Sequence, residues 1–297
     1  MKRHEVTKKA SILGINANLL LLILKGTIGF LSNSQSMIAD SLNSFGDVLS
    51  SVMAYVGNKI SSKEADEDHH MGHGKAEYIF SFLISIVMIV TSLTMIKNAI
   101  LTYWNQVPIT FSWFLVFACC VTIVTKFCLY LYTKILNRKQ KNILIEAMYK
   151  DHRNDCFITS FTLLSAILGM YEFVLLDIVV GILIGLWIGY TSLKLFIKSY
   201  DVLMDKAMDE NTKDKVYDII HRHKEILRVN HFNTTPVGYR YQISFTIFVD
   251  GNLTTFESHD IANTLEREIE REIPEIYLTV IHVNPTEVKK KSKKEKI

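Results

Sequence analysis

Residues 78–96 read YIFSFLISIVMIVTSLTMI and contain no charged side chain, and residues 98–125 contain none either. A helix needs about 20 mostly apolar residues to cross the hydrocarbon core of a bilayer. Both stretches are long enough, so we expect a membrane-spanning helix in each of them. This composition excludes a fully soluble globular protein, a secreted disulfide scaffold and a disordered chain.

The rest of the first two-thirds of the chain supplies more apolar segments. The expected spans are 11–31, 37–58, 78–103, 110–133, 148–170 and 177–199. The second and fifth are weaker by hydropathy, because acidic and polar residues interrupt them. The segments after the first, third and fifth spans carry no Lys or Arg, whereas those after the second and fourth carry several. Because cytoplasmic loops are enriched in these residues, we expect a protein of the cell membrane with both termini in the cytoplasm.

Charge separates the chain into parts. Of the first 206 residues, 34 are Asp, Glu, Lys or Arg, against 29 of the last 91. We therefore expect a transmembrane domain over 1–206, a soluble domain over 207–286 and a basic tail over 287–297. The tail is expected to be disordered, with attraction to anionic membrane lipid as the alternative. A net charge of +3 is too small to indicate nucleic-acid binding.

The soluble part has a mixed pattern. Residues 210–224 and 258–272 have the apolar spacing of amphipathic helices, and Pro274 ends the second. Residues 240–249 alternate as a half-buried strand does, and 276–283 form a last apolar strand. The order helix, strand, strand, helix, strand predicts a small α+β domain of ferredoxin-like type.

The second and fifth spans each carry two oxygen-bearing side chains four residues apart. These are Asn43 and Asp47 in one span and Asp151 and Asp155 in the other. A spacing of four places each pair on one helix face, and ionisable groups inside a membrane indicate a functional site. Two such helices can converge on one cation. The alternative is that the acids only pair with basic residues.

Three short motifs accompany these pairs: GHGKAE at 72–77, LMD at 203–205 and IHVNP at 281–285. Together the features resemble the cation diffusion facilitator family, from about Lys8 to Pro285. The resemblance implies a homodimeric six-span exporter of divalent transition metals, with a cytoplasmic ferredoxin-like domain and proton antiport. It also implies that the transport site consists of Asn43, Asp47, Asp151 and Asp155.

The ligand set bears on which metal is carried. Zinc members of the family typically have a histidine in the fifth-span pair, and here Asp151 takes that position. A set of three carboxylates and one amide is hard, and hard ligands suit manganese, magnesium or calcium. The combination is also similar to that of the manganese-exporting branch of the family. We expect manganese(II) first, iron(II) second, and zinc or cadmium third. His152 lies ~100° around the helix from Asp151 and is expected to face elsewhere. Asp40 is ambiguous.

The cytoplasmic loop between the second and third spans holds a second candidate site. Asp66, His69 and His73 match an interfacial zinc site of the family, and their spacing suits a weak metal-capture site; a solvated acidic loop is the alternative. Lys75 and Asp205 match a charge pair that ties the third and sixth spans together in relatives. A lysine beside a span is otherwise a snorkelling anchor.

In the soluble domain, His259 and His282 match family positions that help to bind metals bridging two subunits, although surface histidines are commoner. Two other function classes fit less well. A membrane-anchored metal sensor needs no ligand pairs inside the bilayer. A membrane-bound metalloenzyme needs a nucleophile and base that the sequence does not indicate. We therefore expect a transporter, not an enzyme, with no tightly bound cofactor.

Overall fold

The computed structural model describes residues 3–31, 35–105, 113–168 and 174–286. Some side chains within these ranges, among them those of Asp40 and Asn43, lie outside the described part, as does the tail 287–297. The chain divides into two compact units, Met1–Leu203 and Met204–Ile297. Each unit is described by itself.

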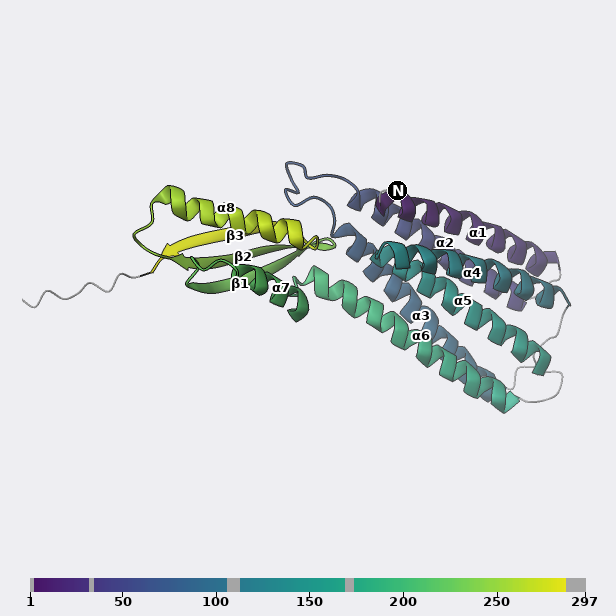
Figure 1. The fold of residues 1–297 in the computed structure, drawn as a ribbon. Helices are drawn as coiled ribbons and strands as arrows, with labels where there is room; N and C mark the ends of the chain where they lie inside the picture. Colours follow the sequence, from purple (N-terminus) through teal and green to yellow (C-terminus); the bar gives the residue numbers. More distant parts are fainter. Residues whose placement is uncertain (1–2, 32–34, 106–112, 169–173, 287–297) are drawn as a thin grey trace, which may run out of the picture. The chain divides into compact units, whose positions relative to one another are not determined.

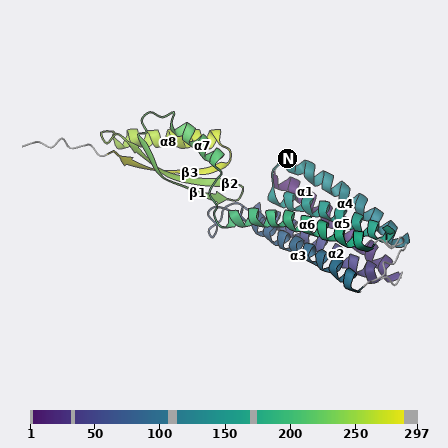
Figure 2. The same cartoon turned by 90° about the horizontal axis from the view of Figure 1, so that it is seen from below.

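The first unit is a bundle of six long helices (Figures 1 and 2), each of which contains most of one expected span. Among the described residues, α1, α3, α4 and α6 contain stretches long and apolar enough to cross a membrane. Polar residues interrupt α2 and α5, and crossing by these two stays an expectation. The helices are α1 Arg3–Leu31, α2 Gln35–Ser61, α3 Ala76–Asn105, α4 Trp113–Lys139, α5 Ile143–Leu168 and α6 Val174–Leu203.

Three helix pairs pack most extensively: α1 with α2, α3 with α6, and α4 with α5. Small residues allow the close approach of α3 and α6, as is usual between membrane helices. The Ser92 hydroxyl of α3 donates a hydrogen bond of 2.8 Å to the Gly185 carbonyl of α6. A Cβ added at Gly185 would lie 2.5 Å from Ile96 Cγ1. The absence of a side chain at Gly185 is therefore what lets these helices touch.

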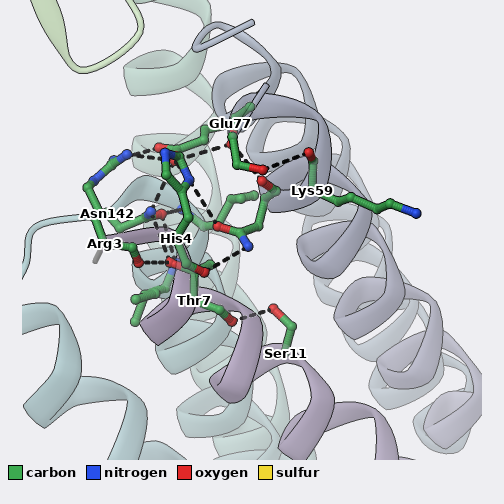
Figure 3. A network of polar contacts seen from close by, with 12 residues as sticks. Arg3, His4, Thr7, Ser11, Lys59, Glu77 and Asn142 are labelled. Carbon is green, nitrogen blue, oxygen red and sulfur yellow. Dashed lines mark hydrogen bonds and ion pairs between the residues drawn. The ribbon is translucent and has the colours of Figure 1, made fainter. Parts of the chain in front are cut away.

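A polar network joins the ends of four of these helices (Figure 3). The Arg3 guanidinium of α1 donates to both carboxylate oxygens of Glu77, in the first turn of α3. The Asn142 amide, just before α5, donates to Glu77 Oε1 and to Thr7 Oγ1, each at 3.2 Å. The Asn58 amide of α2 donates to the backbone carbonyl of His4 in α1 at 3.0 Å. These bonds fix how α1, α2, α3 and α5 meet at this end.

The second unit contains a three-stranded sheet in the order β1-β2-β3. Strands β1 and β2 are antiparallel, and β2 and β3 are parallel. Parallel neighbours need a crossover, which α8 supplies. This arrangement agrees with the expected α+β fold. The elements are α7 Glu210–Ile220, β1 Arg228–Val237, β2 Arg240–Val249, α8 Thr255–Glu272 and β3 Ile276–Pro285.

The core of this unit confirms the apolar spacing read from the sequence. On β2, the inward residues Ile243 and Ile247 are fully buried, and Val216 of α7 and Leu265 of α8 pack in the same cluster. The helix boundaries differ from the expected ones. Helix α7 ends at Ile220, where the backbone turns towards β1. Helix α8 begins at Thr255, because Thr254 and Glu257 form a capping box that the apolar spacing does not reveal.

Candidate metal transport site

Two of the acids expected in the transport site meet at one ammonium group. Lys126 of α4 places its Nζ 2.7 Å from Asp47 Oδ2 of α2 and 2.5 Å from Asp155 Oδ2 of α5. The side chains of Asp47 and Asp155 are 19% and 14% exposed, and that of Lys126 is 1% exposed. Helices α2, α4 and α5 thus converge on one charged cluster inside the bundle.

The backbone around Asp47 is anchored to the neighbouring helix. The Asn18 amide of α1 donates to the carbonyl oxygen of Asp47 at 3.1 Å and to the hydroxyl of Ser51 at 2.9 Å. Asn18 itself is fully buried. The Asn43 backbone lies one turn before Asp47 in α2, and its side chain is outside the described part. The position of Asp47 is therefore set by α1–α2 packing.

The second acid pair lies with a histidine. Ligand atoms of Asp151, His152 and Asp155 all lie within 4.8 Å of one another, whereas we expected His152 to face elsewhere. The ~100° step between neighbouring helix positions describes where their Cβ atoms point, and it does not keep the ends of the two side chains apart. Both ring nitrogens of His152 are buried and have no hydrogen-bond partner among the described residues. An imidazole nitrogen of the type that ligates metals therefore lies beside the carboxylates of Asp151 and Asp155.

Lys126 was not among the residues expected at the site. The sequence held a signal for it, because a charged residue inside an otherwise apolar span is costly and usually functional. Lys126 follows the uncharged stretch 98–125 directly and lies within the fourth expected span. In α4 it shares a buried stripe with Thr122 and Leu129. The sequence did not show that this stripe faces α2 and α5.

Asp66, His69 and His73 also lie together, in the loop between α2 and α3. His69 Nδ1 lies 3.2 Å from Asp66 Oδ1, and His73 Nε2 lies 3.4 Å from Asp66 Oδ2. Burial raises the pKa of Asp66, but hydrogen bonds from His69 and the charges of both histidines bring it below the ordinary value. A carboxylate that stays ionised beside two imidazoles has the donors that a zinc-type site needs.

The roles expected for Lys75, Asp205, His259 and His282 stay predictions, although the structure gives the position of each residue within its own unit. Lys75 lies in the turn before α3, and Asp205 follows α6 with a backbone φ of 54°. They belong to different units, so their pairing stays a prediction. His259 of α8 is exposed, and its Nδ1 lies 2.9 Å from the Asn263 amide nitrogen. His282 is exposed on β3. Metal binding by the two histidines also stays a prediction.

The bundle cluster has the chemistry of reversible cation binding. It gathers the Asp47, Asp151 and Asp155 carboxylates, one imidazole and one ammonium from three helices. Carboxylate oxygens suit hard divalent cations, and imidazole suits zinc, copper, iron and nickel. No covalent chemistry is needed to bind and release such an ion.

Comparison with known proteins also indicates cation transport. Residues 11–204 match the model of the cation efflux transmembrane domain, and residues 208–286 match that of the cation efflux protein cytoplasmic domain. Manganese efflux system proteins MneP and MneS of Bacillus subtilis are 27% and 29% identical to the chain, over 96% and 97% of it and 98% and 100% of their own lengths. Cation-efflux pump FieF of Shewanella oneidensis is 26% identical over 95% of each chain.

The two domain matches follow one another along the chain and together cover nearly all of the described residues. Members of this family are metal transporters and not enzymes, in agreement with the cluster of carboxylates in the bundle. The chain therefore belongs to the cation efflux family and is a multi-pass membrane protein that transports metal ions.

Proposed function

We propose that the protein exports manganese(II) from the cytoplasm across the cell membrane. The observation that carries the proposal is the convergence of Asp47 from α2 with Asp151 and Asp155 from α5. Three carboxylates form a hard donor set, which suits manganese better than zinc. The two Bacillus relatives named for manganese efflux support the same choice.

The proposal also covers the membrane topology, the homodimer, the transport cycle and a capture site. All six bundle helices cross the membrane, and both termini face the cytoplasm. Two copies of the chain form a homodimer, which the match of residues 208–286 to the family's cytoplasmic domain supports. Alternating access carries the metal site from one side to the other, in exchange for protons that compete for the carboxylates. Asp66, His69 and His73 form a weak capture site on the cytoplasmic face.

Iron(II) or zinc export is the second candidate, and His152 is the observation that favours it. Its imidazole lies beside Asp151 and Asp155 and supplies the nitrogen donor that borderline metals prefer. A membrane metal sensor is the candidate from another class. It predicts binding without net movement of the ion.

The test uses the full-length protein reconstituted into vesicles with a manganese indicator inside and an imposed pH gradient. We expect rapid, gradient-dependent manganese uptake that Asp47→Asn and Asp155→Asn each abolish. Asp68→Asn is the matched control, because Asp68 is an exposed acid in the α2–α3 loop. Full uptake by both site variants would exclude the site, and binding without uptake by the unaltered protein would favour a sensor.

The choice of metal needs a separate measurement on the same vesicles. Iron(II), zinc or cadmium is added together with manganese, and the concentration of each that halves manganese uptake is recorded. The proposal expects that zinc and cadmium must each exceed the manganese concentration to halve manganese uptake. A stronger effect of zinc would move the assignment to the second candidate.

A further inference from the structure

Lys126 is a basic side chain that contacts acids of both α2 and α5. It is among the largest fully buried side chains, and its Nζ lies within hydrogen-bond distance of Asp47 Oδ2 and Asp155 Oδ2. Burying an ammonium is costly unless opposite charges pair with it. The lysine is therefore held in place by the same acids that we assign to the metal.

The geometry makes the ammonium and a metal alternative partners of these acids. A dication coordinated by Asp47 Oδ2 and Asp155 Oδ2 would have to lie where the Lys126 ammonium lies, between the two oxygens. Ammonium and dication repel one another at such short range. The ammonium must therefore leave at least one carboxylate oxygen when metal binds, and the flexible four-carbon stem of lysine permits this movement.

Charge does not force the lysine out of the cluster altogether. The three carboxylates of Asp47, Asp151 and Asp155 carry a formal charge of −3, while one dication and one ammonium together carry +3. The formal charge of these three acids is therefore large enough to offset both cations. They only compete for particular oxygen atoms.

We propose that Lys126 is a tethered competing cation that sets the affinity of the transport site and promotes release of the metal. A transport site must bind its ion firmly enough to load and weakly enough to unload. An ammonium fixed to α4 returns to the carboxylates as the metal departs. Because a tethered cation is always present at the site, a free monovalent ion cannot displace it easily, whereas a dication can. Lys126 thus favours divalent cargo. The inference rests on the proposed function.

The experiment compares three variants of the full-length protein. Lys126→Met removes the charge and keeps the length of the side chain, Lys126→Arg keeps the charge, and Lys134→Met removes a lysine of α4 that instead contacts Tyr130. Manganese affinity is measured on purified protein, and uptake is measured in vesicles. We expect Lys126→Met to bind manganese about tenfold more tightly or more, because one repulsion is removed, and to turn over more slowly.

The expected affinities of Lys126→Arg and Lys134→Met are close to that of the unaltered protein. A purely structural lysine would give the opposite sign, since loss of a packing contact weakens binding. Weaker or unchanged manganese binding by Lys126→Met would overturn the inference. If that variant does not fold, Lys126→Gln takes its place, because its amide still donates to the carboxylates without carrying charge, and the same tighter binding is expected.

The result is separable from failure of the proposed function. If the unaltered protein moves no manganese, iron or zinc, the proposed function fails. If the unaltered protein moves metal, Asp47→Asn abolishes uptake and Lys126→Met does not tighten manganese binding, only the role of Lys126 is wrong.

Discussion

The guanidinium of Arg3 donates to both carboxylate oxygens of Glu77, at 2.6 Å to Oε1 and 2.5 Å to Oε2. The side chain of Glu77 is 1% exposed and that of Arg3 is 16% exposed. Paired in this way, a buried carboxylate is tolerated; left alone, it is strongly unfavourable. The contact joins the first turns of α1 and α3, so it ties the N-terminal helix to the bundle.

We predict that Arg3→Ala lowers the stability of the bundle by about 3 kcal/mol, because it removes the guanidinium partner of a buried carboxylate. The measurement is the thermal unfolding midpoint of the purified protein in detergent. Lys8→Ala is the control, since Lys8 is an exposed basic residue of the same helix. Arg3→Ala combined with Glu77→Gln should recover part of the loss, because the buried charge is then removed. Equal midpoints for Arg3→Ala and Lys8→Ala would contradict the prediction.

The contact of α2 with α3 depends on a glycine. A Cβ added at Gly57 would lie 2.7 Å from Phe80 Cβ, which cannot move without moving α3. We predict that Gly57→Ala costs about 1 to 3 kcal/mol through overpacking. Gly46→Ala in the same helix is the matched control, because a Cβ there meets no atom within 4 Å. Thermal unfolding of both variants decides the matter, and a Gly57→Ala midpoint as high as that of Gly46→Ala would refute it.

Replacement of His152 is expected to raise the stability of the protein and to weaken the competition of zinc with manganese. Its two ring nitrogens are buried without a hydrogen-bond partner among the described residues, which is unfavourable for folding. We predict that His152→Leu raises the thermal midpoint. We also predict that zinc competes with manganese uptake about tenfold less well, because a nitrogen donor near the carboxylates is lost. Unchanged competition by zinc would show that His152 takes no part in metal selection.

The cytoplasmic unit supplies a pH prediction. Hydrogen bonds from the side chain and backbone of Thr212 lower the pKa of Asp209, the N-cap of α7. A lowered pKa in the folded state means that the stabilisation is present above the unfolded pKa of about 3.9 and is lost as the pH falls towards the folded value. Asp209→Asn keeps a capping oxygen but cannot be protonated in this way.

We therefore predict that acidification from pH 6 to about pH 3 loosens the start of α7 in the unaltered protein more than in Asp209→Asn. Amide hydrogen exchange in the first turn of α7, corrected for the intrinsic effect of pH, measures the difference. Asp214→Asn serves as the control, since Asp214 is an exposed acid later in the same helix. The same acid response in all three proteins would rule out the cap as its source.

Periodicity in the sequence was sufficient for most of the fold. The apolar runs located the six long helices, since a helix that crosses lipid needs about 20 mostly apolar residues. The alternation at Ile243 and Ile247 identified the inward face of β2, because side chains on a strand point to opposite faces in turn. Helix ends were less certain. Capping at Thr254 depends on individual hydrogen bonds, which apolar spacing does not record.

For the candidate site, the sequence by itself indicated the two acid-bearing pairs as candidate ligands, and their role stays a prediction. A spacing of four places Asp151 and Asp155 on one face of α5, and local helix geometry is enough for that inference. His152 lies with Asp151 and Asp155 of its own helix, which residue spacing alone did not predict. Only the tertiary structure brought Lys126 of α4 to Asp47 of α2 and Asp155 of α5. Such contacts depend on how separate helices are rotated and packed against one another. That rotation is set by the whole bundle, and no single segment of sequence contains it.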